Sequence, residues 1–329
     1  MKKLKLWAIS FAFLAVFSII GNGQTKEVSV RFPVQQDGKY GYIDQTGKIV
    51  ISPQFDFAAE FKDGRALIKA YSFGYIDQTG AKVIPASFNR AETFSEGRAR
   101  IKYGLWGYID QTGTEVIKQE FINAQDFSEG MAGVNTGHKW GFIDRNGNLV
   151  IPAEYDEVDR FSQGLAPVSV NYQWGYIDQS GKRVIEIKFE RAGIFSQGLA
   201  PAKISGKFGY IDKSGKFIIS PQFDNAQPFS EKLALVTIND KYGFINQTGK
   251  MVIKAEYDWA MDFSEGLAAI NLGGIGSGKW GFVDQKGMVI VKPQFDWAWP
   301  FSNGLAKVKV GVKEGYIDKK GKMVWEPSK

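Results

Sequence analysis

The sequence contains no cysteine and only one histidine, His138, in 329 residues. Without cysteine the chain cannot form a disulfide, a thiolate nucleophile, a zinc ribbon or an iron–sulfur cluster, and a single imidazole excludes sites built on two or more histidines. Long helices are also missing, since no segment keeps a 3.6-residue apolar period over a dozen residues without a glycine. The chain is 44% apolar and 14% aromatic, which is typical of a folded protein.

The N-terminus has the three parts of a secretory signal. Lysines precede an apolar run, Leu6–Ile20, which small residues follow at Gly21–Gly23. Fifteen residues are fewer than the roughly 20 needed to span a bilayer comfortably. We therefore expect a cleaved signal peptide at residues 1–23 and an exported protein, which is periplasmic, displayed on the cell surface or secreted. The alternative is an uncleaved membrane anchor.

The net charge indicates no nucleic-acid partner. The chain carries +6, but residues 1–23 hold three lysines and no acid, which leaves +3 for the rest. Basic and acidic residues are mixed in every segment, whereas a nucleic-acid binder gathers its lysines and arginines on one stripe.

A repeated unit dominates the remaining sequence. Two blocks recur. The first is an aromatic–Gly anchor followed by Ile-Asp-x-x-Gly, and the second has the form Phe-Ser-Glu-Gly. Each second block begins 20 residues after its anchor glycine. Such a period is typical of a repeat architecture. The anchor glycines are Gly41, Gly74, Gly107, Gly141, Gly175, Gly209, Gly243, Gly281 and Gly315.

Each unit reads as three strands and a bent connector. The Asp-x-x-Gly block predicts a hairpin turn, in which the carboxylate caps the turn and glycine takes the left-handed position; we single out Asp44 with Gly47 and Asp178 with Gly181. The connector fits either a short helical turn or a bent extended segment. Nine units fill residues 28–326 as a single domain, between a short linker at 24–27 and a tail at 327–329.

These motifs resemble the WG-repeat (KWG-repeat) family of bacterial proteins. The resemblance is carried by Lys139-Trp140-Gly141-Phe142-Ile143-Asp144 and Lys279-Trp280-Gly281-Phe282-Val283-Asp284. It implies a β-rich, often exported protein and supplies no catalytic residue. The sequence departs from the family pattern where another residue replaces the anchor tryptophan, at Tyr40, Phe73, Phe208, Tyr242 and Glu314.

The recurring acids do not indicate a metal or catalytic site. Each hairpin turn offers one carboxylate, which is too few for calcium, and Asn246 replaces the aspartate in one unit. The acid of the second block alternates with Gln163 and Gln197, which cannot act as general acids. The loop Gly273–Lys279 approaches a phosphate-binding motif, but Trp280 stands where Ser or Thr would hold magnesium. We therefore expect no catalytic residue, no metal, no cofactor and no nucleotide.

Comparison of the units with one another singles out Trp259, Met261, Trp297 and Trp299. They occupy two connector columns that hold polar or charged residues in most other units. The columns therefore predict an exposed apolar patch for a partner, and aromatic rings stack well on sugars or peptides. The alternative is that the terminal units bury these rings.

The predicted architecture is an all-β array of nine tandem three-stranded repeats, open and superhelical. A closed β-propeller is the alternative. It is disfavoured because each unit has three strands in about 34 residues, where a blade usually has four in about 40, and because nine units exceed the usual four to eight blades. We expect a non-enzymatic protein that binds a protein or a cell-envelope polysaccharide and meets a membrane only through its signal segment. Alternative roles are a purely structural envelope or spacer protein and, less favoured, an enzyme of the glycosidase type.

Overall fold

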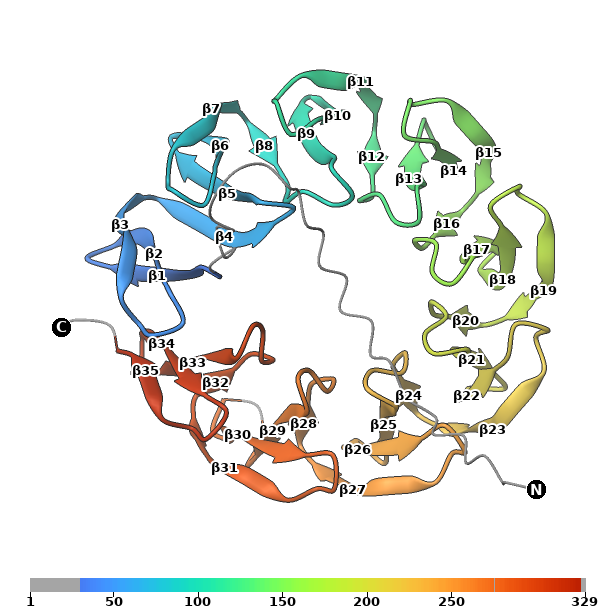
Figure 1. Cartoon of the computed structure of the whole chain (residues 1–329). Helices are drawn as coiled ribbons and strands as arrows, with labels where there is room; N and C mark the ends of the chain where they lie inside the picture. Colours follow the sequence, from blue (N-terminus) through green and yellow to red (C-terminus); the bar gives the residue numbers. More distant parts are fainter. Residues whose placement is uncertain (1–29, 275, 327–329) are drawn as a thin grey trace, which may run out of the picture.

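The computed structural model, which describes residues 30–274 and 276–326, is a ring of nine small antiparallel sheets (Figure 1). The chain is thus a nine-bladed β-propeller; the expected open superhelical array is wrong and the closed alternative is correct. The predicted signal peptide (1–23), linker (24–27) and tail (327–329) lie outside the described residues. In the described part, no helix is long and apolar enough to cross a membrane.

Blade 1 has three strands and blades 2 to 9 have four, ordered from the centre of the ring outward. The innermost strands of blades 2 to 9 are β4 (Phe57–Lys62), β8 (Arg90–Ala91), β12 (Asn123–Ala124), β16 (Glu157–Val158), β20 (Arg191–Ala192), β24 (Asn225–Ala226), β28 (Trp259–Ala260) and β32 (Trp297–Ala298). The next strands of blades 1 to 9 are β1 (Phe32–Gln36), β5 (Arg65–Ala70), β9 (Ala99–Tyr103), β13 (Ala132–Asn135), β17 (Leu165–Val170), β21 (Ala200–Ile204), β25 (Leu233–Ile238), β29 (Leu267–Leu272) and β33 (Leu305–Val310).

The anchor and outermost strands complete each blade. The anchor strands are β2 (Lys39–Ile43), β6 (Ser72–Ile76), β10 (Leu105–Ile109), β14 (Trp140–Ile143), β18 (Gln173–Asp178), β22 (Lys207–Ile211), β26 (Lys241–Asn246), β30 (Lys279–Asp284) and β34 (Lys313–Asp318). The outermost strands are β3 (Ile49–Phe55), β7 (Lys82–Phe88), β11 (Glu115–Phe121), β15 (Leu149–Tyr155), β19 (Arg183–Phe189), β23 (Phe217–Phe223), β27 (Met251–Tyr257), β31 (Val289–Phe295) and β35 (Met323–Trp325).

The connector supplies the fourth strand, so the expected three-stranded unit is incomplete. In blade 8, Trp259 pairs with Asn271 and Ala260 with Ile270. Ala260 is buried while Trp259 points to solvent, as successive side chains of a strand alternate between its faces. Two paired residues are therefore enough to make the inner strand of a blade.

The anchor glycine allows two strands to lie unusually close together. A Cβ added to Gly141 in β14 would lie 2.4 Å from the carbonyl oxygen of Ile151 in β15. The pairing of these strands is irregular at this point, between Trp140 and Phe142. Only glycine fits beside the neighbouring backbone here, which explains why it follows the anchor aromatic.

The core lies between blades. One cluster joins Phe142 and Ile151 of blade 4 to Phe161 and Val168 of blade 5, and the rings of Phe142 and Phe161 are 4.9 Å apart. Each blade thus buries its apolar face against the next, as in other repeat proteins.

The last blade packs against the first in the same way, and this contact closes the ring. The Tyr316 hydroxyl in blade 9 donates to the Pro33 carbonyl in blade 1 at 2.9 Å, just as Tyr176 of blade 5 donates to Gly193 of blade 6 at 2.7 Å. Phe32, Leu305, Tyr316 and Trp325 share one buried cluster. Closure therefore depends on side-chain packing between neighbouring blades.

Candidate functional site

The structure brings together two of the four predicted site residues, Trp259 and Trp297. Each starts an inner strand, in blade 8 and blade 9 respectively, and each side chain is 37% exposed. Met261 is half-buried and packs against the core between these blades. Trp299 is half-buried as well and lines a separate cavity with Tyr316 and Lys307 at the ring seam.

Aromatic neighbours hold both exposed indoles in place. Trp259 stacks on Tyr242 of blade 7, with ring centroids 5.3 Å apart and an interplanar angle of 27°. Trp297 lies 4.8 Å from Trp280, the anchor aromatic of blade 8, and 6.2 Å from Trp299. Both rings therefore keep a defined orientation while a face or edge stays open to solvent.

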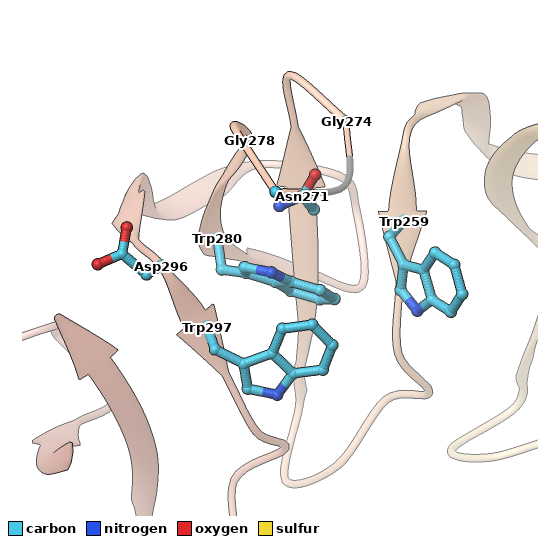
Figure 2. Close-up of a pocket in the computed structure, with 8 residues that line it drawn as sticks. Trp259, Asn271, Gly274, Gly278, Trp280, Asp296 and Trp297 are labelled. Atoms are coloured by element: carbon cyan, nitrogen blue, oxygen red, sulfur yellow. The ribbon is translucent and has the colours of Figure 1, made fainter. Parts of the chain in front are cut away.

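A cavity of about 230 Å³ separates the indoles of blades 8 and 9 (Figure 2). Trp259 forms one side, and Trp280 with Trp297 forms the other. Asn271 of β29 and the glycines of the β29–β30 loop, Gly274, Gly276 and Gly278, complete the lining. We call this cavity the Trp pocket. It lies at the end of the blades that carries the β29–β30 loop and the equivalent hairpin loops of the other blades, and we call this end the loop face.

Asn271 is the buried polar residue of the Trp pocket. Its side chain is only 4% exposed, and no donor among the described residues reaches its Oδ1. In blade 4 the equivalent residue is Asn135. Its Oδ1 accepts a hydrogen bond from the backbone N–H of Gly137 at 3.1 Å. Among the described residues of the longer blade 8 loop none donates to Asn271, and its Oδ1 stays buried and unpaired against the backbone of Gly278.

The carboxylate of Asp296 at the pocket rim is already engaged. It pairs with Lys279 of blade 8 and accepts the backbone N–H of Gly311 in blade 9 at 2.6 Å. The hydrogen bond from Lys279 is the main cause that holds the pKa of Asp296 below its ordinary value. The same arrangement joins Lys139, Asp156 and Asn171. The Lys–Asp pair is therefore a clamp between blades, which was not predicted from the sequence.

The turn residues selected from the sequence lie on the opposite face, which we call the turn face. Oδ1 of Asp178 accepts the Ser180 hydroxyl at 2.6 Å and the N–H groups of Ser180 and Lys182, and Gly181 has a φ of 82°. Asp44 and Gly47 have the same arrangement, with a φ of 86° at the glycine. The pKa of Asp178 is lowered, chiefly by the Ser180 hydroxyl. These aspartates cap turns and contact no part of the Trp pocket.

The acids of the second block join neighbouring blades, a role that the sequence did not predict. The Glu129 carboxylate of blade 4 accepts the backbone N–H groups of Gln163 and Gly164 in blade 5, at 2.6 and 2.8 Å. Gln163 in turn accepts the N–H of Gly198 in blade 6 at 2.9 Å. An amide can replace the acid because both supply the acceptor oxygen. Across residues 30–274 and 276–326, no cluster of three His, Asp or Glu side chains is placed to hold a metal ion.

Comparisons with known proteins agree with this architecture. The model of the "WG containing repeat" matches eight consecutive segments across residues 40–313. A crystal structure of the eukaryotic initiation factor is 13% identical, covers 91% of this chain and 95% of its own, and superposes with a TM-score of 0.65. Dihydro-heme d1 dehydrogenase NirN is also 13% identical, over 84% of this chain and 75% of its own, with a TM-score of 0.50. No curated protein matches the sequence. At these identities the solved structures are similar in fold alone.

Proposed function

The chain belongs to the family of WG-containing repeats, and from that premise we propose that it is an exported, non-enzymatic binding module. Its partner is a protein or a cell-envelope polysaccharide, which it contacts through the loop face at blades 8 and 9. The observation that carries the proposal is the Trp pocket, in which Trp259 and Trp297 stay 37% exposed around a cavity instead of closing on each other. Exposed aromatic rings fixed around a pocket are typical of binding sites.

The positions of the carboxylates support a binding role over hydrolysis. A glycosidase needs two free carboxylates about 5–10 Å apart in one cleft. In this propeller the recurring acids cap turns or join blades, as Asp178, Glu129 and Asp296 do. The proposal predicts no turnover of envelope polysaccharides by the purified protein, and robust hydrolysis would refute it.

Capture from an envelope fraction tests the binding role. The native protein is compared with a Trp259→Ala, Trp297→Ala double variant and with Phe57→Ala. Phe57 occupies the same column in blade 2, is 40% exposed and packs on Tyr40, which makes it a matched control. We expect the native protein and Phe57→Ala to retain one envelope component that the double variant loses. Equal capture by all three folded proteins would instead favour a structural or spacer role.

Cell fractionation tests export. Cleavage near Gly23 predicts that the protein accumulates outside the cytoplasm with its N-terminus close to Gln24. A chain that stays in the membrane fraction with Met1 or Lys2 at its N-terminus would show that the apolar run is an anchor.

A further inference from the structure

We propose that the seam between blades 9 and 1 binds an extended peptide segment of a protein partner, which pairs with the inner edge of β1 and inserts a phenylalanine side chain between these blades. The site is separate from the Trp pocket, and the inference goes beyond the function proposed above. The repeat itself defines the occupant, because a connector of the chain brings a phenylalanine into each of the other eight junctions of the ring.

In the described part of the chain, the inner edge of blade 1 carries no strand. β1 pairs with β2 alone, whereas the corresponding strand of blade 4, β13, also pairs with the inner strand β12 through Asn135 and Asn123. Gln35 takes the place of Asn135 in the register with the anchor strand. Its backbone N–H and C=O therefore point toward the centre of the ring, where they can pair with one more strand.

The seam also has space for an aromatic ring. At the other eight junctions, the ring that follows the anchor glycine packs on the connector phenylalanine of the next blade, with centroids 4.8–5.1 Å apart, as between Phe142 and Phe161. Among the described residues Tyr316 of blade 9 has no such partner and lies 5.4 Å from Phe32 of β1 instead. Tyr316 and Phe32 line a cavity of about 220 Å³, and a second cavity of the same volume shares Phe32 and Ser302 with it.

The hydroxyl of Ser302 offers a donor to the backbone of the segment. In blade 8 the equivalent Ser264 donates to the carbonyl of Phe301, the connector phenylalanine of blade 9, at 2.6 Å. Ser302 accepts the side-chain amide of Asn303 at 3.2 Å, and its own hydroxyl has no acceptor within residues 30–274 and 276–326. A bound phenylalanine would bring its carbonyl to this hydroxyl, as Phe301 does for Ser264.

The hydroxyl of Tyr316 fits the same segment. In blade 5 the equivalent Tyr176 donates to a carbonyl of the connector, that of Gly193. Tyr316 donates to the Pro33 carbonyl of β1, although the corresponding carbonyl of blade 5, at Pro167, accepts a connector N–H. A bound segment supplies both missing groups, an N–H for Pro33 and a carbonyl for Tyr316.

The connectors also specify the sequence of the segment. Their commonest form is Ala-x-x-Phe-Ser, as at residues 124–128, in which the alanine and the phenylalanine are buried. Residues 21–29, which precede β1 in the chain, contain no aromatic residue. We therefore assign the segment to a partner protein, which adds its strand to a sheet edge and places its phenylalanine in a pocket, a common mode of peptide recognition.

Titration of the full-length protein with an acetylated and amidated peptide of residues 123–130, followed by calorimetry, tests the inference. We expect saturable binding, and the same peptide with Phe127→Ala should bind about tenfold more weakly or worse. Hydrogen exchange at the Gln35 amide should slow when the native peptide binds. Absence of binding, or equal binding of the two peptides, would overturn the inference.

Two serine variants locate the site. Ser302→Ala should weaken peptide binding about threefold or more without lowering the melting temperature, because its hydroxyl has no acceptor to lose among the described residues. Ser264→Ala is the matched control, which should lower the melting temperature and leave the peptide affinity unchanged. Equal effects of the two variants on affinity would contradict a site at the seam. The Trp259→Ala, Trp297→Ala variant should bind the peptide like the native protein, so a failure of envelope capture and a failure of peptide binding remain distinguishable.

Discussion

Gly47 lies at the seam between blades 9 and 1, and its replacement by alanine tests ring closure. A Cβ at Gly47 would lie 2.2 Å from the carbonyl oxygen of Val324 in β35. In blade 5, Gly181 occupies the same turn position with a similar φ, but a Cβ there would meet only the Ile151 side chain, at 3.5 Å. Gly181→Ala is therefore the matched control for Gly47→Ala.

Both substitutions strain the backbone, but only one of them also causes a steric clash. Each places alanine in a left-handed conformation, which costs about 1–2 kcal/mol. Only Gly47→Ala also forces β35 away by about 1 Å, and overpacking of this kind adds about 1–3 kcal/mol. In a closed ring we therefore expect Gly47→Ala to lower the free energy of unfolding by about 2–5 kcal/mol and Gly181→Ala by about 1–2 kcal/mol.

Urea unfolding followed by circular dichroism measures both values. In addition, Tyr316→Phe should cost less in the Gly47→Ala background than in the native protein, because the displaced seam has already weakened the hydrogen bond from Tyr316 to Pro33. Equal destabilisation by the two alanines, with additive effects of Tyr316→Phe, would mean that the ring is open in solution and would refute the closed architecture.

Three further predictions concern the contacts that repeat around the ring. Glu129→Ala should destabilise the protein by about 1 kcal/mol and Glu129→Gln by less, because the amide keeps an acceptor for Gln163 and Gly164. Thermal melts compare the two variants. Equal losses of stability would contradict a role of these hydrogen bonds in joining the blades. Asp178→Asn should leave the melting temperature at pH 7 nearly unchanged while Asp178→Ala lowers it, since Asn246 already caps the same turn through its Oδ1. The pKa values of Asp44, Asp178 and Asp296 lie below the ordinary 3.8 in the folded protein. The ionised carboxylates therefore contribute their full stability above about pH 3.8, and this stability is lost as the pH falls through the lowered pKa values. Melting temperatures should therefore drop below about pH 4, and a rise on acidification would contradict the assignment.

Three of the four strands of a blade were predictable from the sequence because each leaves a local pattern. The anchor strand, the Asp-x-x-Gly turn and the strand after it follow from alternation and turn chemistry, and β18 with β19 shows the expected hairpin around Asp178 and Gly181. The inner strand escaped prediction because it has only two residues, which is too short for alternation to appear. A signal was nevertheless present: most units hold alanine at its second residue, as at Ala260 and Ala298, and both are buried.

Closure and the pocket escaped prediction for a different physical reason. Whether repeats close depends on the small rotation from one unit to the next, which packing between blades sets and no single unit encodes. The pocket combines residues that are far apart in the sequence. The two exposed tryptophans could be found by comparing columns, whereas Trp280 was interpreted as an anchor and Asn271 was not considered. The loop insertion before Trp280 was the available signal.

The repeat also explains how one site can differ from its neighbours on the same fold. Blades 5 and 6 form a cavity at the equivalent place, but Glu157 and Arg191 stand where blades 8 and 9 have Trp259 and Trp297. Ser169 occupies the Asn271 position there, and its hydroxyl accepts the backbone N–H of Glu157 at 3.0 Å. The turns and the anchor glycines are the same in both pairs of blades, so a few side chains and one longer loop are enough to change the chemistry of the cleft. Specific binding by this propeller therefore requires differences between blades, and the Trp pocket is such a difference on the loop face.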